Sequence, residues 1–174
     1  MKKAASIFLR AEVEPRDVLR LSDWMQNRRV TRYLNEDACA SQQLIRLLET
    51  TPTPMLACRF NQRGRFFLIC NERQDSIGFA RLKEEPGSGC CEIVFAIGEE
   101  RLWGNGYGTQ AVRAVQSHAF LERRARKLTA NIYHGNARSV KTICRCGFHE
   151  EERLQKLSRY SITMDEYLNF LKRA

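Results

Sequence analysis

The chain of 174 residues has no apolar run that approaches the ~18 residues needed to span a membrane. Its first ten residues contain two lysines and a short apolar stretch that ends at Arg10. A secretory signal needs an apolar region of ~7–15 residues followed by a cleavage site, and neither is present. We therefore expect no membrane segment and a cytoplasmic location.

The sequence also lacks a disulfide framework and a complete set of metal ligands. The seven cysteines are odd in number and are scattered through expected strands and helices. Cys144, Cys146 and His149 are the one group that suggests zinc, but no second pair of Cys or His supplies the remaining ligands. We expect the cysteines to serve core packing and the chain to bind no metal.

Acidic residues are too few to balance the basic ones. The chain has 20 Asp and Glu against 29 Lys and Arg, which gives a formal net charge of +9. This charge fits a nucleic acid, an acidic surface or an anionic ligand. The basic cluster at residues 123–127 has no interleaved aromatics of the kind that RNA-binding sheets carry. We interpret it as a solvated helix end and expect no specific nucleic-acid partner, with a nucleic-acid or ribosome-surface binder as the alternative.

The order of apolar patterns predicts an α+β fold with a mostly antiparallel central sheet, flanked by helices, as one domain over residues 1–174. The composition, 43% hydrophobic and 28% charged, is typical of a globular chain. Pro15 and Ser41 mark two early helix starts, Ser41 as an N-cap, whereas Asn136 and Gly147 bound a late helix. We expect strands at 7–10, 65–70, 76–82, 91–97, 127–133, from 148, and at 158–164, and helices at 17–25, 42–49, 107–121, 136–147 and 165–172.

A glycine-rich loop connects the strand that ends at Ile97 to the longest expected helix. Strand, glycines and helix together expose unpaired N–H groups at a helix N-terminus, where a phosphate can bind. The alternative is a tight turn that needs glycine only for its backbone angles. The spacing differs from the dinucleotide fingerprint, which would need glycine where Thr109 stands, and no Gly-Lys-Ser/Thr sequence follows. The loop consists of Trp103, Gly104, Asn105, Gly106, Tyr107 and Gly108.

This loop resembles the pyrophosphate loop Q/R-x-x-G-x-G/A of the GCN5-related N-acetyltransferases (GNAT), with Trp103 at the first position. Downstream, Asn136 and Ser139 through Gly147 and Phe148 are similar to the N-x-x-S/A…G-F helix that flanks the pantetheine arm in that family. Upstream, residues 24–34 resemble the first helical region of the branch that includes ribosomal-protein N-terminal acetyltransferases. The three motifs occur in the family's order and span most of the chain.

The resemblance implies a GNAT-like fold and an N-acetyltransferase that uses acetyl-CoA. The acceptor it implies is a primary amine, in particular a peptide or protein N-terminus; a polyamine or aminoglycoside acceptor and a non-catalytic acetyl-CoA-binding module are the alternatives. Trp24 and Tyr33 are candidates for the acceptor pocket, with core packing as the alternative for both. The oligomeric state stays open. The residues implied in acetyl-CoA binding are Phe95, Ala96, Ile97, the six loop residues, Thr109 and Asn136.

The family's usual proton donor, a tyrosine seven residues after the helix-opening Asn, is replaced here by Ile143. Ser139 is the nearest substitute, although it could instead cap the helix. Glu92 is the candidate general base and His134 a candidate proton relay, with ordinary surface positions as the alternatives. No cysteine stands beside a His and Asp arrangement, so we expect direct transfer without a covalent enzyme intermediate.

Overall fold

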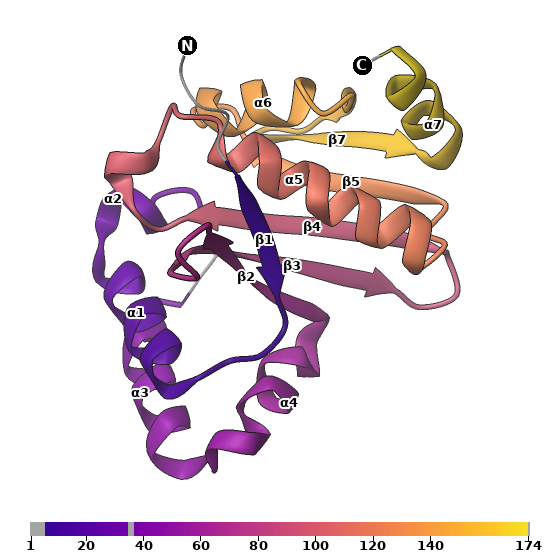
Figure 1. Ribbon diagram of the computed structural model, residues 1–174. Coiled ribbons are helices and arrows are strands. Elements are labelled where there is room, and N and C mark those ends of the chain that lie inside the picture. Colours follow the sequence, from indigo (N-terminus) through magenta and orange to yellow (C-terminus); the bar gives the residue numbers. More distant parts are fainter. Residues whose placement is uncertain (1–5, 35–36, 174) are drawn as a thin grey trace.

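Seven strands form one sheet in the computed structural model, which describes residues 6–34 and 37–173 (Figure 1). The strand order is β1-β2-β3-β4-β5-β7-β6, and only β4 and β5 run parallel. The predicted α+β class with a mostly antiparallel sheet is therefore confirmed. The strands are β1 (Ile7–Arg10), β2 (Arg65–Asn71), β3 (Ser76–Glu85), β4 (Cys90–Ile97), β5 (Lys127–Tyr133), β6 (His149–Arg153) and β7 (Leu157–Thr163).

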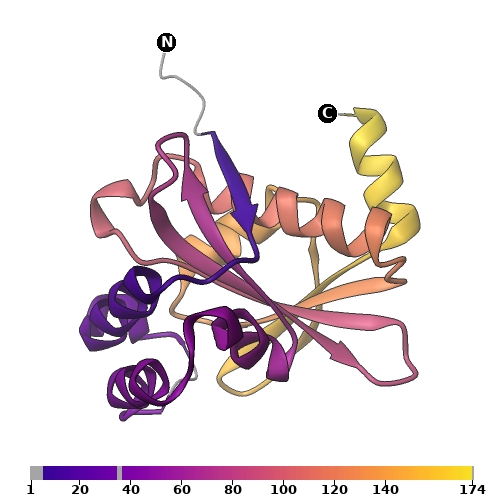
Figure 2. The same cartoon turned by 60° about the horizontal axis from the view of Figure 1, so that its bottom comes forward.

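Helices cover both faces of this sheet and create two apolar cores. Figure 2 shows α1, α3 and α4 on the side of the sheet opposite to α5. Because side chains alternate along a strand, Phe66 and Leu68 of β2 enter the first core, whereas Phe67 and Ile69 enter the second. The α-helices are α1 (Pro15–Gln26), α2 (Arg28–Thr31), α3 (Ala40–Thr50), α4 (Leu56–Phe60), α5 (Tyr107–Ser117), α6 (Ala137–Cys144) and α7 (Met164–Arg173).

Several predicted helix boundaries differ from the structure by two to four residues, and one helical region was missed. Helix α3 begins at Ala40 with Cys39 at the N-cap, so Ser41 lies inside the helix, where its hydroxyl is 2.7 Å from the Ser22 hydroxyl. Helix α5 ends at Ser117, and a π-helical turn (His118–Glu122) continues it. Residues 53–63, which follow Pro52 and contain Pro54, form short helical turns around α4 that the sequence pattern did not indicate. None of the described helices is long and apolar enough to cross a bilayer.

A buried carboxylate joins the first strand, the first helix and the third strand. Asp17 is 2% exposed and accepts hydrogen bonds from Arg10 Nη2 at 2.7 Å and from Ser76 Oγ at 3.0 Å. Its second oxygen accepts the backbone N–H of Glu14 at 2.9 Å, which completes the start of α1. Because all three donors bind one buried carboxylate, Asp17 fixes the position of the start of α1 relative to β1 and β3.

We predict that Asp17→Asn lowers the free energy of unfolding by about 3 kcal/mol, because the amide cannot accept at both oxygens and leaves Arg10 without its counter-charge. Urea denaturation measures the loss. Asp23→Asn is the matched control, since Asp23 lies exposed on the same helix. Equal urea midpoints for the two variants would contradict the role given to Asp17.

Candidate functional site

Strands β4 and β5 start side by side and then separate. They pair through Cys90 with Lys127, Cys91 with Leu128, and Glu92 with Thr129, and no further. On its other side β4 stays paired with β3 as far as Ile97. From Ile93 onward, the β5 side of β4 therefore presents backbone groups without a strand partner.

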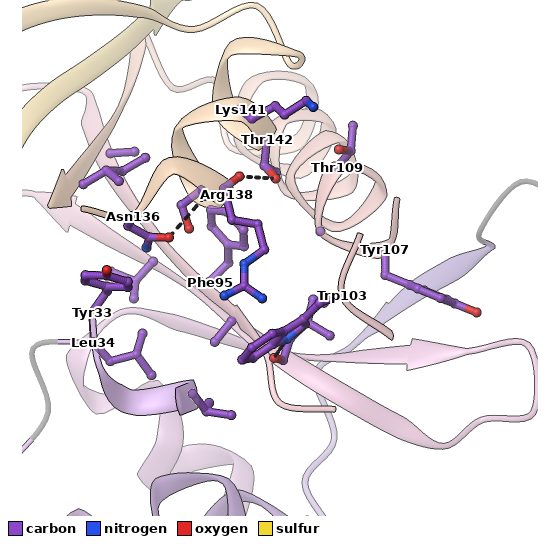
Figure 3. Close-up of a pocket in the computed structure, with 18 of the residues that line it drawn as sticks. Tyr33, Leu34, Phe95, Trp103, Tyr107, Thr109, Asn136, Arg138, Lys141 and Thr142 are labelled. Atoms are coloured by element: carbon purple, nitrogen blue, oxygen red, sulfur yellow. Dashed lines mark hydrogen bonds between the residues drawn. The ribbon is translucent and has the colours of Figure 1, made fainter. Parts of the chain in front are cut away.

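A cavity of about 440 Å³ occupies this gap (Figure 3). It is lined on one side by the last turn of the first helical region, with Tyr33 and Leu34, and on the other by α5 and α6. The Tyr33 hydroxyl donates to Gly135 O at 2.9 Å, which connects the two sides at one end of the gap. The sequence-predicted residues that line the cavity are Tyr33, Phe95, Ala96, Ile97, Trp103, Gly104, Gly106, Tyr107, Gly108, Thr109, Asn136 and Ser139.

The N-terminus of α5 faces the cavity with its backbone donors unused by the helix. Gly106 is the N-cap residue, with φ of +88°, a conformation that favours glycine. The first helical hydrogen bond runs from Gln110 N to Gly106 O, so the N–H groups of residues 106–109 have no intrahelical partner. Among the described residues, no side chain caps this helix. Such an end, with its positive dipole, is suited to a phosphate group.

Helix α6 and its C-cap residue add cations beside the N-terminus of α5. Arg138, Lys141 and Arg145 all line the cavity, and with Thr142 they form a stripe at helical spacing. The guanidinium carbon of Arg138 lies 3.7 Å from the centroid of the Trp103 ring, and the Trp103 indole N–H donates to Ile97 O at 2.7 Å. The Trp103 ring therefore places the Arg138 guanidinium beside the first position of the loop, where the family pattern has Gln or Arg. The i, i+3, i+4, i+7 spacing of this stripe is a signal in the sequence, although its cations were not among the predicted site residues.

Four sequence-predicted residues do not line the cavity. Trp24 is 5% exposed and packs in the core, where its indole N–H donates to Glu99 Oε1 at 3.3 Å. The Asn105 amide donates to carbonyls of its own loop, and His134 is exposed, with its backbone N–H donating to Lys156 O. Glu92 belongs to the last paired position of β4, next to the cavity.

Glu92 is connected to the cavity through a neighbouring amide. The Glu92 carboxylate accepts a hydrogen bond from Asn131 Nδ2 at 3.1 Å, and Asn131 lines the cavity. Lys83 Nζ lies 3.8 Å from the other carboxylate oxygen. The carboxylate is thus paired, half-buried and placed at the point where the two strands part.

The capping alternative for Ser139 is excluded by the geometry of α6. Asn136 is the N-cap residue, and its side chain accepts the backbone N–H of Ser139 at 3.3 Å. The Ser139 side chain lines the cavity, whereas the Thr142 hydroxyl donates to Arg138 O at 3.0 Å. Ile143 is fully buried in the core on the other side of the helix. Ser139 is therefore the α6 hydroxyl available at this wall.

The cysteines are free thiols with no shared site. Cys144 is exposed while Cys146 is buried, and burial raises the pKa of the Cys146 thiol to about 11. Burial likewise raises the pKa of Cys70 and Cys91, so these thiols stay protonated near neutral pH. In the described part of the chain, no cluster of three His, Cys, Asp or Glu residues is arranged to hold a metal ion.

Comparisons with known proteins agree with this geometry. A family profile described as the acetyltransferase (GNAT) domain matches residues 7–149. A crystal structure of spermidine N-acetyltransferase from Vibrio cholerae in complex with CoA and spermine superposes with a TM-score of 0.78 at 20% identity, covering 94% of this chain and 98% of that one. The aminoglycoside acetyltransferase AAC(6')-Ib in complex with coenzyme A gives a TM-score of 0.75 at 16% identity, covering 97% and 100%. At these identities the structures show a shared fold.

A sequence relative covers a smaller part of the chain. The uncharacterized protein YkkB of Bacillus subtilis is 36% identical over 71 residues, which are 39% of this chain and 41% of that protein. The chain thus matches less than half the length of this relative. These comparisons do not separate the branches of the family, so the resemblance to ribosomal-protein N-terminal acetyltransferases stays a prediction.

We predict that Gly106→Val abolishes binding of coenzyme A, which is the ligand that the sequence resemblance implies for this loop. A β-branched side chain opposes the positive φ of Gly106 and crowds the donors at the start of α5. Calorimetric titration with coenzyme A gives the affinity. Gly87→Val is the matched control, because Gly87 also has a positive φ, of +75°, but lies in the β3–β4 turn with no other group within 4 Å of an added Cβ. A folded Gly106→Val protein that binds as tightly as Gly87→Val would refute the assignment of the loop.

Proposed function

The chain belongs to the GNAT acetyltransferase family and is an acetyl-CoA-dependent N-acetyltransferase; on that premise we propose that its acceptor is a primary α-amine, such as the N-terminus of a peptide. The observation that supports the proposal is the cavity between the separated strands β4 and β5, which has the free N–H groups of α5 at one end, the open edge of β4 along it and Tyr33 on the other side. The finer proposal, the α-amine, rests on how the carboxylates around the site are paired.

The residues of the donor side fit acetyl-CoA. The free N–H groups at the start of α5 and the cations Arg138, Lys141 and Arg145 would hold its phosphates. The open edge of β4 from Phe95 to Ile97 would receive the pantetheine amides in place of a neighbouring strand. When bound, acetyl-CoA supplies the acetyl group as a reactive thioester.

The residues of the chain then have three tasks. Backbone N–H groups on the open edge of β4 stabilise negative charge on the acetyl oxygen. Glu92, held by its hydrogen bond from Asn131, receives through water the proton that the attacking amine loses. Ser139, from the first turn of α6, donates a hydrogen bond to the departing sulfur. The raised thiol pKa values argue against a cysteine nucleophile, so the transfer is direct.

The carboxylates around the site do not form a polycation pocket. Glu99 and Glu100, which precede the glycine loop, lie within 3.6 Å of Arg101 and 2.7 Å of Arg29, respectively. On the edge strand β6, Glu152 lies 3.7 Å from Arg159. On the inner strand β3, Glu84 pairs with Arg123 at 3.0 Å. Among the described residues that line the cavity there is no Asp or Glu, whereas four are Arg or Lys. A polyamine would therefore meet a net positive site.

An α-amine also suits a site in which Glu92 and Ser139 are the proposed catalytic side chains. Its pKa of ~7.7–8.0 leaves a substantial fraction neutral at cellular pH. A lysine amine with a pKa of ~10.4 must first lose its proton, which costs roughly 4 kcal/mol at pH 7.5. Because Glu92 already shares its charge with Lys83 and Asn131, a weakly basic acceptor makes the smaller demand on it.

A second candidate is a small-molecule amine acceptor. The structural neighbours include a spermidine N-acetyltransferase with spermine bound and an aminoglycoside acetyltransferase with kanamycin bound. Both have the fold of this chain over more than nine-tenths of its length. The acceptor experiment below distinguishes the two candidates.

We predict that Ser139→Ala lowers kcat by about 30-fold, corresponding to ~2 kcal/mol, while the Kd for coenzyme A changes little. Steady-state kinetics and calorimetry give the two values. Ser139→Thr keeps the hydroxyl and serves as the conservative control. Because Asn136 caps α6, the alanine variant should keep its helix and its melting temperature. A turnover within twofold of the parent would remove Ser139 from the mechanism.

We further predict that a short peptide with a free N-terminus has a higher kcat/KM than two other amines. The first is the same peptide with a blocked N-terminus and one lysine, and the second is spermidine. Kanamycin belongs in the panel as the aminoglycoside representative. If spermidine, kanamycin or the lysine peptide ranks first, the α-amine proposal is wrong and the small-amine or side-chain candidate takes its place. Acetyl-CoA binding without turnover on any of them would indicate the non-catalytic module instead.

A further inference from the structure

A second cavity, of about 470 Å³, lies between the helices α1, α3 and α4 and the sheet strands β2 and β3. Figures 1 and 2 show these three helices together on one face of the sheet, opposite to α5. The described residues that line it are all different from those that line the first cavity. Its size falls in the range of ~300–1,000 Å³ that holds small organic molecules.

The buried part of the lining, called the floor here, is aromatic and recessed. The centroid of the Phe66 ring lies 4.7 Å from that of Phe60 and 6.0 Å from that of Phe79. Each of the three rings is 7% exposed or less, and Leu44 and Leu47 of α3 are half-buried beside them. Among the described residues, no exposed large hydrophobic side chain lines the cavity. The floor is therefore reached by a group that enters the cavity, whereas a flat partner resting on the surface would not contact it.

Three exposed arginines form the rim of the cavity: Arg46 from α3, Arg59 from α4 and Arg63 from the turn after α4. Their guanidinium groups form no ion pair or hydrogen bond with another described residue. None of the described lining residues is an Asp or Glu. A fourth lining arginine, Arg81, has a partner within the fold and lies over a floor ring, so it is not counted in the rim. The opening thus has three positive charges that the described chain does not neutralise.

The rim segment after α3 is fixed to the sheet by one asparagine side chain. Asn61 Nδ2 donates to Ala57 O of α4 at 2.7 Å, and Asn61 Oδ1 accepts the backbone N–H of Phe66 in β2 at 3.0 Å. Asn61 lies between Arg59 and Arg63 in the sequence. These bonds therefore fix the backbone that carries both arginines relative to the aromatic floor.

The opposite wall is fixed in a similar way. The hydroxyl oxygens of Ser22 in α1 and Ser41 in α3 are 2.7 Å apart, and Gln26 Nε2 donates to Ser41 Oγ at 3.1 Å. These bonds hold α3, and with it Arg46, against α1. Binding groups on fixed elements lose less conformational freedom when a ligand binds than groups on a mobile loop.

We propose that this second cavity is a ligand site separate from the acetyl-transfer site, and that it binds a carboxylate with an apolar body, such as a medium-chain fatty acid. The apolar body packs against the phenylalanine floor, and the carboxylate accepts charge-assisted hydrogen bonds from the rim. Arg59 and Arg63 are four residues apart and repel each other, and a bound anion relieves this repulsion. Occupancy of the site stabilises the folded protein by mass action.

The test uses octanoate as the probe, and calorimetry gives its Kd for the whole chain. 1-Octanol has the same chain length without the charge, and acetate has the charge without the chain. Both should bind about tenfold more weakly or worse than octanoate. Octanoate at 100 times its Kd should raise the Tm by about 5 °C. A saturating concentration of coenzyme A should leave the Kd of octanoate unchanged, because the two cavities have separate linings.

The double variant Arg59→Gln/Arg63→Gln should raise the Kd of octanoate about tenfold, since it removes two of the three rim charges. Both positions are exposed, so the variant should fold as the parent does. The matched control is Arg65→Gln/Arg73→Gln, which removes the same charge from exposed positions outside the cavity. The control should bind octanoate as tightly as the parent, which separates local pairing from the effect of net charge.

The site is refuted if octanoate does not bind, or if the rim variant binds it as tightly as the control variant does. Displacement of octanoate by coenzyme A would place the probe in the first cavity and would equally overturn the proposal. A further arm uses vesicles of phosphatidylglycerol. If the parent binds these vesicles through Arg59 and Arg63 but does not bind octanoate, the rim faces an anionic membrane surface and the proposal is wrong.

Discussion

The separation of β4 from β5 is the constraint on which the rest of the site depends. These are the parallel neighbours of the sheet, and their pairing covers three residue pairs. At the paired end, Arg126 N donates to Gly89 O at 2.8 Å, which holds the two strands together. At the open end, the Trp103 indole N–H donates to Ile97 O. The crossover from β4 to β5 contains α5, and the N-terminus of this helix lies at the gap. A fully paired sheet would satisfy the backbone of β4 and leave no room for a ligand.

Positive charge around the gap comes from two elements with different chemistry. Helix α5 offers backbone dipoles, which are fixed and carry no side-chain entropy cost, whereas α6 offers long cationic side chains. Trp103 couples them, because its ring orients Arg138 while its N–H anchors the loop to β4. A tryptophan at this position therefore does not remove the expected cation from the site. It supplies that cation from the neighbouring helix.

The sequence predicted the strands, their order along the chain and the loop, because each has a strong local signal: apolar and β-rich runs, turn residues between them, and glycines before a helix. Through the family resemblance it also named 12 of the 25 described residues that line the cavity. It could not separate Tyr33 from Trp24, since both are aromatics in the same helical region and only packing decides that Trp24 is buried against Gly98. Asn105 adjoins lining residues, but its amide donates to carbonyls of its own loop, and His134 is exposed two residues before Asn136. The cations on and just after α6 could have been predicted from the sequence, because their helical spacing is a local signal.

Strand β4 connects donor and acceptor chemistry through the alternation of its side chains. Phe95 and Ile97 pack toward the core under α5, whereas Ala96 packs with the core formed by α1 and α3. The open backbone edge of the same strand faces β5 between them. On the proposed function, an acetyl group held at that edge would have α5 and α6 on one side and α1 and α3 on the other. Because side chains and backbone of one strand point in three different directions, the eight residues of β4 would bring donor and acceptor together without a moving part.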